Sequence, residues 1–572
     1  MGDRVKDWDL YQSGIRFNNR LQPSYYETTD TNLAFMNGDQ WRNMKETKLP
    51  KPVFNIIKRV ITFFVASLTT SNVKIHFEPM LYADNMDITQ EVDAADVANT
   101  KVSDLLDKFK IGNRIKDALF DAAITGDACA HFYWDVNKKP YGGQYGEIKG
   151  EISMELVDGT NVFFGNGNNP NVDVQPYIII SGRDMVENLR EEAKSHKGGE
   201  EDRIISDVNY EYEAGDNAKF EVDADEYGKA LYIIVYRKDK KTGQITASKC
   251  VENAYIYKDV PTGLTRYPIA WMNWEKVKNC YHGRAICTGI LPNQIFINRM
   301  FAMVMYHLMM TAFPKPVYNS DYISNWSNEI GTAIPVQGLG MDANIKNLAG
   351  YLEPGSMSNQ IVQALELAMQ YTKETLGISD AALGQVDPKN TSAIIAVQKS
   401  SAIPLENPKS NLYEWIEDIG RILFDMMGTY YGLRPIVMEQ PDEMTGEATK
   451  QAIEFDFSVF KDLWLNVNAD VGEASYWSEI AAVQTLDNLL SNGHMDIVDY
   501  LERVPDEYIP RKQELIDKLK QQMQAQADHE AQQQQMIQFM ESLPPEVQAQ
   551  IEQLPPDQAE QMVLQMMQSG GM

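Results

Sequence analysis

The side chains most able to do chemistry are scattered along this sequence without the spacing that a reaction needs. Histidines that bind a metal recur on one helix face, as in H-E-x-x-H, and structural zinc sites pair cysteines as C-x-x-C. Neither spacing occurs, so we expect no catalytic residue, no metal site and no cofactor. The seven histidines lie at positions 76, 131, 196, 282, 307, 494 and 529, and the four cysteines at 129, 250, 280 and 287.

Motifs that bind phosphate or activate a nucleophile are also missing. There is no G-x-x-x-x-G-K-[ST] loop and no G-x-S-x-G turn. Gly338-Leu339-Gly340 lacks the third glycine of a dinucleotide fingerprint and lies between two predicted helices. Pro441-Asp442 with Glu447 and Lys450 is similar to a metal-dependent nuclease signature, but its acid-to-lysine spacing is one residue too wide. The sequence therefore indicates a protein that is not an enzyme.

The composition is that of an ordinary globular protein. With 572 residues, 44% hydrophobic and 23% charged, the chain is long enough for several domains with apolar cores. The charged residues 1–10 contain no signal-peptide core. Two apolar runs, residues 56–68 and 300–313, are shorter than the ~18–20 residues that cross a bilayer. We expect no membrane span, no secretion and reduced thiols.

The charge balance is strongly acidic. The chain has 81 Asp and Glu against 52 Lys and Arg, a net charge of −29, and residues 441–572 contain 24 of the acidic and only 7 of the basic residues. Affinity for DNA comes from cations that neutralise phosphates. Such a chain either has no nucleic-acid partner or lets a duplex pass without binding it.

Residues 1–282 mix helical and strand patterns, which predicts an α+β body. Residues 56–68 indicate a buried helix, and alternating apolar and polar side chains over 151–156 predict a half-buried strand. Lys241-Thr242-Gly243-Gln244 predicts the turn of a β-hairpin between two apolar runs. Residues 183–228 are charged and aperiodic, so we expect a mobile surface insertion there.

The middle of the chain predicts two helices around a small module. Pro292 should begin a helix that runs to about Phe313. Its apolar residues cover nearly the whole circumference, which is typical of a helix buried on every side. About 40 residues rich in Gly, Asn and aromatics follow. The second helix, from residue 356 or 358 to Gly377, has one apolar stripe at Ile361, Leu365, Ala368, Thr372 and Leu376.

The C-terminal part is mainly helical. We expect a short helix at 390–398, broken by Pro404 and Pro408, then a helix at 412–427, strands within 452–467 and two helices within 476–500. The last 52 residues, from Gln521, contain 16 Gln and 7 Met but no Lys or Arg. They predict either a flexible Gln-rich tail or short helices that become ordered only when copies of the chain pack together.

Several segments together resemble the portal proteins of tailed bacteriophages, the rings at one capsid vertex through which DNA is packaged and ejected. No segment is specific alone; their order around the helix–module–helix centre carries the resemblance. The Gln/Met-rich tail is not part of the shared pattern. The segments are Asn37-Gly38-Asp39-Gln40-Trp41, residues 52–58, residues 117–126, residues 267–270, Tyr281-His282-Gly283-Arg284, residues 294–298 and residues 390–394.

The resemblance implies a mainly helical α+β portal-type fold with an α/β wing, a two-helix stem, a small α/β clip and a helical C-terminal crown or barrel. In this sequence it places the wing at 1–282 with its return at 411–473, the stem helices at 283–313 and 356–377, the clip at 314–355, a channel loop and helix at 378–410, the crown at 474–520 and the tail or barrel at 521–572.

The resemblance also implies partners. It implies a closed homo-oligomeric ring of about 12 copies, a conduit for double-stranded DNA without sequence-specific binding. It implies docking of the large terminase motor, head–tail adaptors, and the major capsid and scaffold proteins. Assembly would occur in the host cytoplasm, with no membrane, and the ring would then stay at a capsid vertex of the virion. Candidate ring-interface residues in the stem are Phe296, Met300, Phe301, Met305, Leu365 and Leu376, and candidate DNA-facing residues in the channel are Lys389, Lys399 and Lys409.

Two other classes remain open. One is a phage enzyme that processes nucleic acid with an unrecognised site, which divalent-metal-dependent turnover of DNA would reveal. The other is a different capsid or tail connector, such as an adaptor. Adaptors are usually much shorter and lack a long apolar helix pair, so the length of this chain argues against them.

Overall fold

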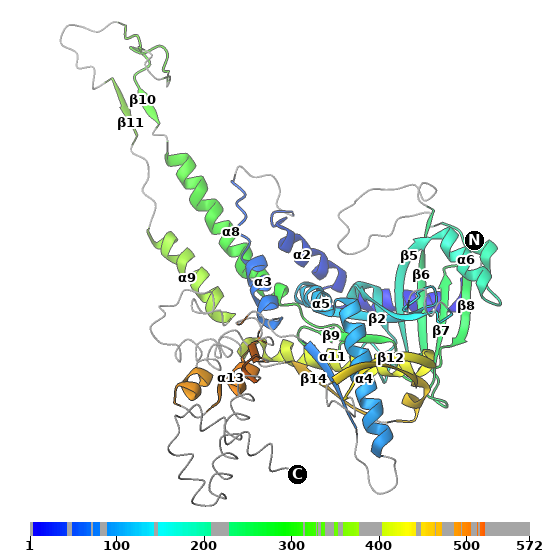
Figure 1. The fold of residues 1–572 in the computed structure, drawn as a ribbon. Helices are drawn as coiled ribbons and strands as arrows, with labels where there is room; N and C mark the ends of the chain where they lie inside the picture. Colours follow the sequence, from blue (N-terminus) through cyan, green and yellow to red (C-terminus); the bar gives the residue numbers. More distant parts are fainter. Residues whose placement is uncertain are drawn as a thin grey trace, which may run out of the picture. The chain divides into compact units, whose positions relative to one another are not determined.

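The structure, a computed structural model (Figure 1), divides the chain into two compact units, Met1–Gly472 and Glu473–Met572. The second unit begins one residue before the expected start of the crown. The residues that the structure describes are 4–42, 49–69, 73–79, 88–141, 147–206, 228–312, 315–327, 329, 333–337, 348–352, 359–376, 403–441, 448–463, 465–471, 485–492, 495–504 and several between 509 and 520.

The core of the first unit is a three-stranded antiparallel sheet packed against helices. Its order is β3-β2-β9, and Phe132 of β2 and Ile152 of β3 are buried. The indole of Trp415 in α11, also buried, donates to the carbonyl of Ala270 in β9 at 3.1 Å. The helix predicted at 56–68 and the strand predicted at 151–156 are both present. The elements are α3 (Ile56–Leu68), α4 (Ile88–Phe109), α5 (Ile111–Thr125), β2 (Asp127–Asp135), β3 (Glu151–Val157), β9 (Ile269–Asn273) and α11 (Glu406–Tyr430).

A five-stranded antiparallel sheet forms the other half of the predicted α+β body (Figure 1). The predicted hairpin turn joins β6 to β7, and a second turn joins β7 to β8. Trp8 and Tyr11 of α1 pack on Phe163 and Ile179 of this sheet. The elements are α1 (Lys6–Arg20), α2 (Tyr25–Asn37), β4 (Val162–Phe164), β5 (Tyr177–Met185), β6 (Lys229–Lys238), β7 (Ile245–Val251) and β8 (Ala254–Pro261).

The expected insertion at 183–228 is regular over its first part, so that expectation was wrong there. Strand β5 continues to Met185 and helix α6 (Val186–Ser195) follows it. Leu189 and Ala193 of α6 are buried against β6–β8. The two residues are four positions apart, so they form a narrow apolar stripe on one side of a short amphipathic helix. Most of the other residues of α6 are charged or polar, so the sequence shows little periodicity there. Residues 207–227 lie outside the described residues.

A helix pair with a small ribbon at its tip occupies the middle of the chain (Figure 1). The helices α8 (Ile286–Thr311) and α9 (Asn359–Thr375) contact each other, and strands β10 (Pro316–Tyr318) and β11 (Ala349–Tyr351) pair antiparallel. The first helix begins earlier than predicted, so Pro292 lies inside α8. Because Cys287 and Ile290 are buried in the core, tertiary packing holds the turn before the proline in helical form.

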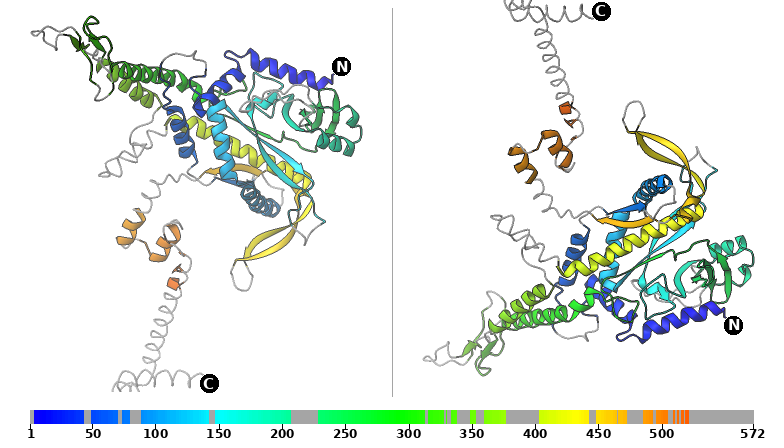
Figure 2. Two further views of the ribbon diagram at one scale, coloured as in Figure 1. Left: turned by 90° about the horizontal axis from the view of Figure 1, so that it is seen from above. Right: turned by 90° about the horizontal axis from the view of Figure 1, so that it is seen from below.

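Two further antiparallel strand pairs include the last strands of the first unit. Strand β1 (Val73–Pro79) pairs with β14 (Leu465–Val471). Strands β12 (Leu433–Pro441) and β13 (Ala448–Asp456) form a hairpin that extends beyond the end of α11 (Figure 2). Pro408 was expected to break a helix, but it lies in the first turn of α11. The backbone N–H groups of a first helical turn have no acceptor within the helix, so the N–H that proline lacks costs nothing there.

In the second unit, the described helical residues are 485–491, α13 (Ile497–Arg503), and residues 512, 515, 516 and 518–520. Val498 and Leu501 of α13 form a small buried cluster with Ile516. The short helix predicted at 390–398 and the tail from Gln521 onward lie outside the described residues. Both interpretations of that tail therefore remain predictions.

Candidate functional site

Buried amide side chains join the base of α8 to the N-terminal segment. The Nε2 of Gln294 donates to the carbonyl of Phe54 at 2.7 Å, and its Oε1 accepts from the backbone N–H of Ile56 at 3.0 Å. The same Nε2 donates to Asn298 at 2.9 Å, and Asn298 donates to Gln40 at 2.6 Å. We call Gln40, Gln294 and Asn298 the amide chain. Three of the segments that carry the family resemblance meet in it.

Asn55 fixes the start of α3 beside the amide chain. Its Oδ1 accepts from the backbone N–H of Lys58 at 3.0 Å, which caps the helix, and its Nδ2 donates to the carbonyl of Met36 at 2.9 Å at the end of α2. The indole of Trp41 donates to the carbonyl of Pro52 at 2.9 Å. The end of α2 and the start of α3 are thus held together by side chain to backbone hydrogen bonds, and Gln294 joins α8 to the start of α3 in the same way.

A second buried cluster surrounds Asp127 at the start of β2. Its carboxylate accepts from Nδ1 of His282 at 2.6 Å, Nδ2 of Asn273 at 2.6 Å, the backbone N–H of Gly283 at 2.7 Å and the hydroxyl of Tyr25 at 2.9 Å. Burial, followed by the charge of Asp127, raises the pKa of Tyr25 well above its ordinary value, so this hydroxyl stays protonated and donates. Two more segments of the resemblance, 117–126 and 281–284, meet here.

His282 is a structural ring in this cluster. Its other nitrogen, Nε2, contacts Oδ1 of Asn18 at 3.0 Å, so both nitrogens face acceptors. The ring stacks on Tyr25 with 3.7 Å between centroids and is 3% exposed. A general base needs a free nitrogen that can reach a substrate. This arrangement orders the chain just before α8 instead.

A third cluster surrounds the buried carboxylate of Glu151 on β3. It accepts from the hydroxyl of Tyr431 and from Lys108 at 3.3 Å, and Lys101 lies at 4.0 Å. Burial alone would raise the pKa of Glu151, but the two lysines and the tyrosine outweigh it and hold the pKa below its ordinary value. Burial also lowers the pKa of Lys101, against the pull of Glu151. The cluster ties β3 to α4 and to the end of α11.

The helix α8 is apolar around most of its circumference, as predicted, but a single chain covers only part of it. The face with Gln294, Asn298 and Phe301 lies against α3 and the N-terminal segment, where the Phe301 ring is 4.4 Å from that of Phe54. Phe296 and Met303, which share another face at i and i+7, are 47% and 50% exposed. A single chain thus leaves an apolar stripe of this helix in contact with solvent.

The six predicted stem residues divide into four on α8, which are exposed or half-buried, and two on the predicted stripe of α9, which face the chain's own core. Phe296 and Met305 are exposed, and Met300 and Phe301 are half-buried. Leu365 is buried and Leu376 half-buried, on the inward stripe that the sequence predicts for α9, so both already have neighbours within the chain. The sequence missed Met303, Met310 and Tyr371, all exposed, because the pattern of α8 does not distinguish its faces.

Of the three channel lysines, the structure describes only Lys409. It is exposed on the first turn of α11, with its Nζ 5.5 Å from the centre of the Tyr413 ring. Lys389 and Lys399 lie outside the described residues. The expected channel segment, 378–410, therefore ends inside α11 rather than before it.

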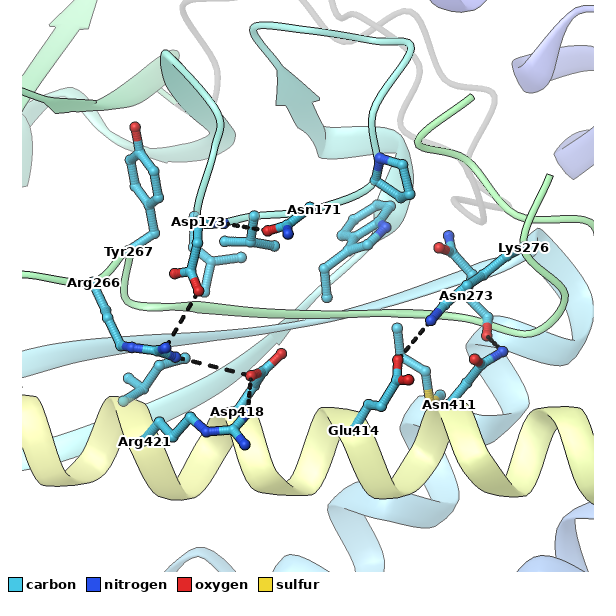
Figure 3. A pocket seen from close by; sticks show the side chains of 16 residues that line it. Asn171, Asp173, Arg266, Tyr267, Asn273, Lys276, Asn411, Glu414, Asp418 and Arg421 are labelled. Atoms are coloured by element: carbon cyan, nitrogen blue, oxygen red, sulfur yellow. Dashed lines mark hydrogen bonds and ion pairs between the residues drawn. The ribbon is translucent and has the colours of Figure 1, made fainter. Parts of the chain in front are cut away.

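A cleft of about 310 Å³ between α11 and the loops before and after β9 collects charged side chains (Figure 3). Arg266 pairs with Asp173 at 3.3 Å, and Lys276 pairs with Glu414 at 2.6 Å. Burial raises the pKa of Asp418, and Arg421, at 3.0 Å, opposes that rise. The Lys276–Glu414 pair, and Arg266 at 4.0 Å from Asp418, join α11 to the body across the cleft.

The described residues offer little metal or redox chemistry. Within the described ranges, no three His, Cys, Asp or Glu side chains gather as a metal ion would need. The four cysteines are free thiols, and burial raises the pKa of Cys287 to about 12. Lys450 lies opposite Glu439 in the β12–β13 hairpin, while Asp442 and Glu447 lie outside the described residues. In the described part of the chain, no helix is both long and apolar enough to span a membrane.

Comparison with protein families identifies the class, a phage portal protein. The model of the phage P22-like portal protein family matches residues 190–570, about two thirds of the chain. The chain therefore belongs to the P22-like phage portal protein family. A search of curated proteins finds no match. The match includes the Gln/Met-rich tail, which the resemblance had left out, and begins after the N-terminal segments on which the resemblance partly rested.

Membership supports a phage portal role, which is structural. It implies a homo-oligomeric ring at the capsid vertex of the virion that contacts the capsid and the packaging machinery. The helix pair, with its incompletely covered apolar surface, is the part of the described structure that bears most directly on such an assembly.

Proposed function

We propose that this chain forms a closed ring of about 12 copies at one capsid vertex. The ring is a conduit for double-stranded DNA during packaging and ejection, and it docks the terminase motor and the head–tail adaptors. It assembles in the host cytoplasm with the scaffold and major capsid proteins. In this ring α8 and α9 are the stem, and residues 314–355 with the β10–β11 ribbon are the clip.

One observation carries this proposal: the open apolar surface of α8. Phe296, Met303 and Met310, which share one face of α8 at i, i+7 and i+14, are 47%, 50% and 49% exposed in the single chain. Contiguous exposed apolar surface of this kind marks an interface. A heterologous contact, repeated around an axis, closes into a ring and covers this surface in every copy.

The acidic charge suits a conduit. The net charge of −29 and the excess of carboxylates after residue 441 give a passing duplex no counterion-release gain, so the wall does not hold it. The protein contributes no chemistry in this mechanism. The motor and its ATP site belong to a partner.

The test is the mass and shape of the purified full chain. A single chain weighs 64.9 kDa, so a ring of about 12 copies weighs about 780 kDa. Light scattering gives the mass, and negative-stain images of the same fraction show whether a central hole is wide enough for duplex DNA. Met303→Glu should reduce the yield of rings at least ~10-fold, because it buries a charge in each contact.

Val174→Glu is the matched control, because Val174 is 60% exposed on a loop far along the chain from the stem. It should leave the rings unchanged. Some rings close only around a scaffold, so a monomeric preparation is also mixed with capsid and scaffold proteins. A chain that stays monomeric there, or a compact dimer that cuts DNA with a divalent metal, would contradict the proposal.

A further inference from the structure

The start of α3 presents cations beside an exposed aromatic ring. Lys58 and Arg59 are exposed, and neither takes part in an ion pair with any of the described residues. The Phe54 ring is 47% exposed and packs on Phe301 of α8, so the whole corner is fixed to the stem. We call Phe54, Lys58 and Arg59 the α3 corner.

The outward face of α9 has the complementary character. Glu366 and Glu374 are exposed, and Glu374 accepts only from Gln370, at 2.8 Å, among the contacts that the structure describes. Tyr371 between them is 61% exposed. Because Leu365 and Thr372 turn the opposite side of α9 inward, these three side chains look away from the chain's own core. We call Glu366, Tyr371 and Glu374 the α9 face.

The two surfaces lie on helices that pack against the same stem helix. Both α3 and α9 contact α8 (Figure 1). Leu376, just beyond α9, and Ile56, the first residue of α3, also pack against the same hydrophobic core cluster. In a ring built around the stem, the exposed sides of α3 and α9 are therefore surfaces of the stem region that a neighbouring copy can reach.

We propose that the α3 corner of one copy docks on the α9 face of the next copy in the ring. Lys58 and Arg59 meet Glu366 and Glu374, and Phe54 meets Tyr371. This inference rests on the proposed function and names the two surfaces that a heterologous contact requires, one on each side of every subunit. Opposite charges at such a contact fix its register and disfavour wrong pairings.

Charge reversal in two variants tests the contact. Lys58→Glu/Arg59→Glu puts four carboxylates at the contact, and Glu366→Lys/Glu374→Lys puts four cations there. Each variant alone should need at least ~10-fold more protein to form rings. Mixed in equal amounts, the two variants should assemble again, because every contact in an alternating ring is then between opposite charges.

The control variant is Lys240→Glu/Lys241→Glu, which makes the same change of charge at an exposed hairpin turn and should assemble like the wild type. Restoration on mixing also shows that both variants are folded. If either variant does not fold, Lys58→Gln/Arg59→Gln and Glu366→Gln/Glu374→Gln replace them. Each should then weaken assembly, and raising the salt concentration should weaken wild-type assembly to the same extent.

If every charge variant forms rings as readily as the wild type, the inference is wrong and the proposed function stands. Absence of wild-type rings would instead contradict the proposed function. Variants that assemble normally but lose salt-sensitive binding of a short DNA duplex would assign the α3 corner to DNA, and would also overturn the inference.

Discussion

Gln294 on α8 and Phe54 before α3 are 240 residues apart in the sequence, yet the Gln294 amide donates to the Phe54 carbonyl at 2.7 Å. Gln294 is 1% exposed. The bond fixes the entry to α3 against the stem helix, and the remaining oxygen of the same amide accepts from the first two N–H groups of α3, at 3.0 and 3.4 Å. One side chain therefore couples the stem to the body.

Gln294→Met should lower the stability of the chain by about 1–3 kcal/mol, because it removes the hydrogen bonds of a buried amide and leaves the buried N–H of Ile57 without its acceptor. Amide hydrogen exchange is the sharper measurement. The N–H of Ile57 should exchange faster, while that of Ile56, which also donates to the Phe54 carbonyl at 2.8 Å, and those of α5 keep their protection. Gln363→Met, on the exposed side of α9, is the control and should change neither quantity. Unchanged exchange at Ile57 would show that the Gln294 side chain contributes nothing there.

Asp127→Asn should destabilise the chain more strongly, by about 3–5 kcal/mol. Four donors converge on this carboxylate, and an amide would turn its own N–H groups toward some of them. Thermal unfolding followed by circular dichroism measures the loss. Asp202→Asn, at an exposed position, should shift the melting temperature little. A small effect of Asp127→Asn would mean that the cluster is solvated in the protein.

The sequence predicted the regular elements where one periodicity dominates. The strand at 151–156, the hairpin around residues 241–244 and the inward stripe of α9 follow from alternation, turn residues and helical spacing. The class of protein followed from the order of several weakly specific segments, and the family match confirms this class. The first turns of α8 were missed because Pro292 gives a stronger start signal than the buried Cys287 and Ile290 before it.

The polar clusters could not be predicted, because each joins side chains distant in the sequence. Gln40, Gln294 and Asn298 are ordinary amides until folding brings them within hydrogen-bond distance. The same holds for Asp127 and His282, 155 residues apart. Only the segments around these side chains carry a signal in the sequence, as a resemblance to a family. The structure adds that these segments are neighbours in space at the base of the stem.

Glu151→Gln should produce a pH-dependent loss of stability. The pKa of Glu151 is lowered in the folded chain, so its charge stabilises the fold above the ordinary Glu pKa, and this stabilisation is lost as the pH falls through the lowered value. At neutral pH the variant should therefore unfold at a lower urea concentration than the wild type. Its free energy of unfolding should be lower by about 1–3 kcal/mol.

The difference in the free energy of unfolding between Glu151→Gln and the wild type should become smaller as the pH falls. The change should occur between the ordinary pKa of Glu and the lowered pKa of Glu151 in the folded chain. Urea unfolding at several pH values measures it. Glu187→Gln, exposed on α6, should show no such trend. A difference that stays constant with pH would mean that packing around the side chain, and not its charge, stabilises the fold.

Replacing the three predicted channel lysines should alter DNA movement but not assembly. Lys409 is exposed on the first turn of α11, where its charge is free to meet a phosphate, and we propose that Lys389 and Lys399 contribute in the same way. On an acidic wall a few cations hold DNA transiently. The triple variant with Gln at all three positions should form normal rings and change either the packaging rate or the retention of packaged DNA.

Lys197, Lys240 and Lys241 are exposed lysines of the wing region, and their triple replacement by Gln is the control with the same change of charge. Packaging reactions with purified motor and capsids measure the rate, and release of DNA from filled capsids at increasing salt measures retention. If the channel lysines act on phosphates, the difference between the two triple variants should shrink as salt rises, because screening weakens the contact in the wild type alone. Equal packaging and equal retention in both variants at low salt would show that these lysines do not touch the DNA.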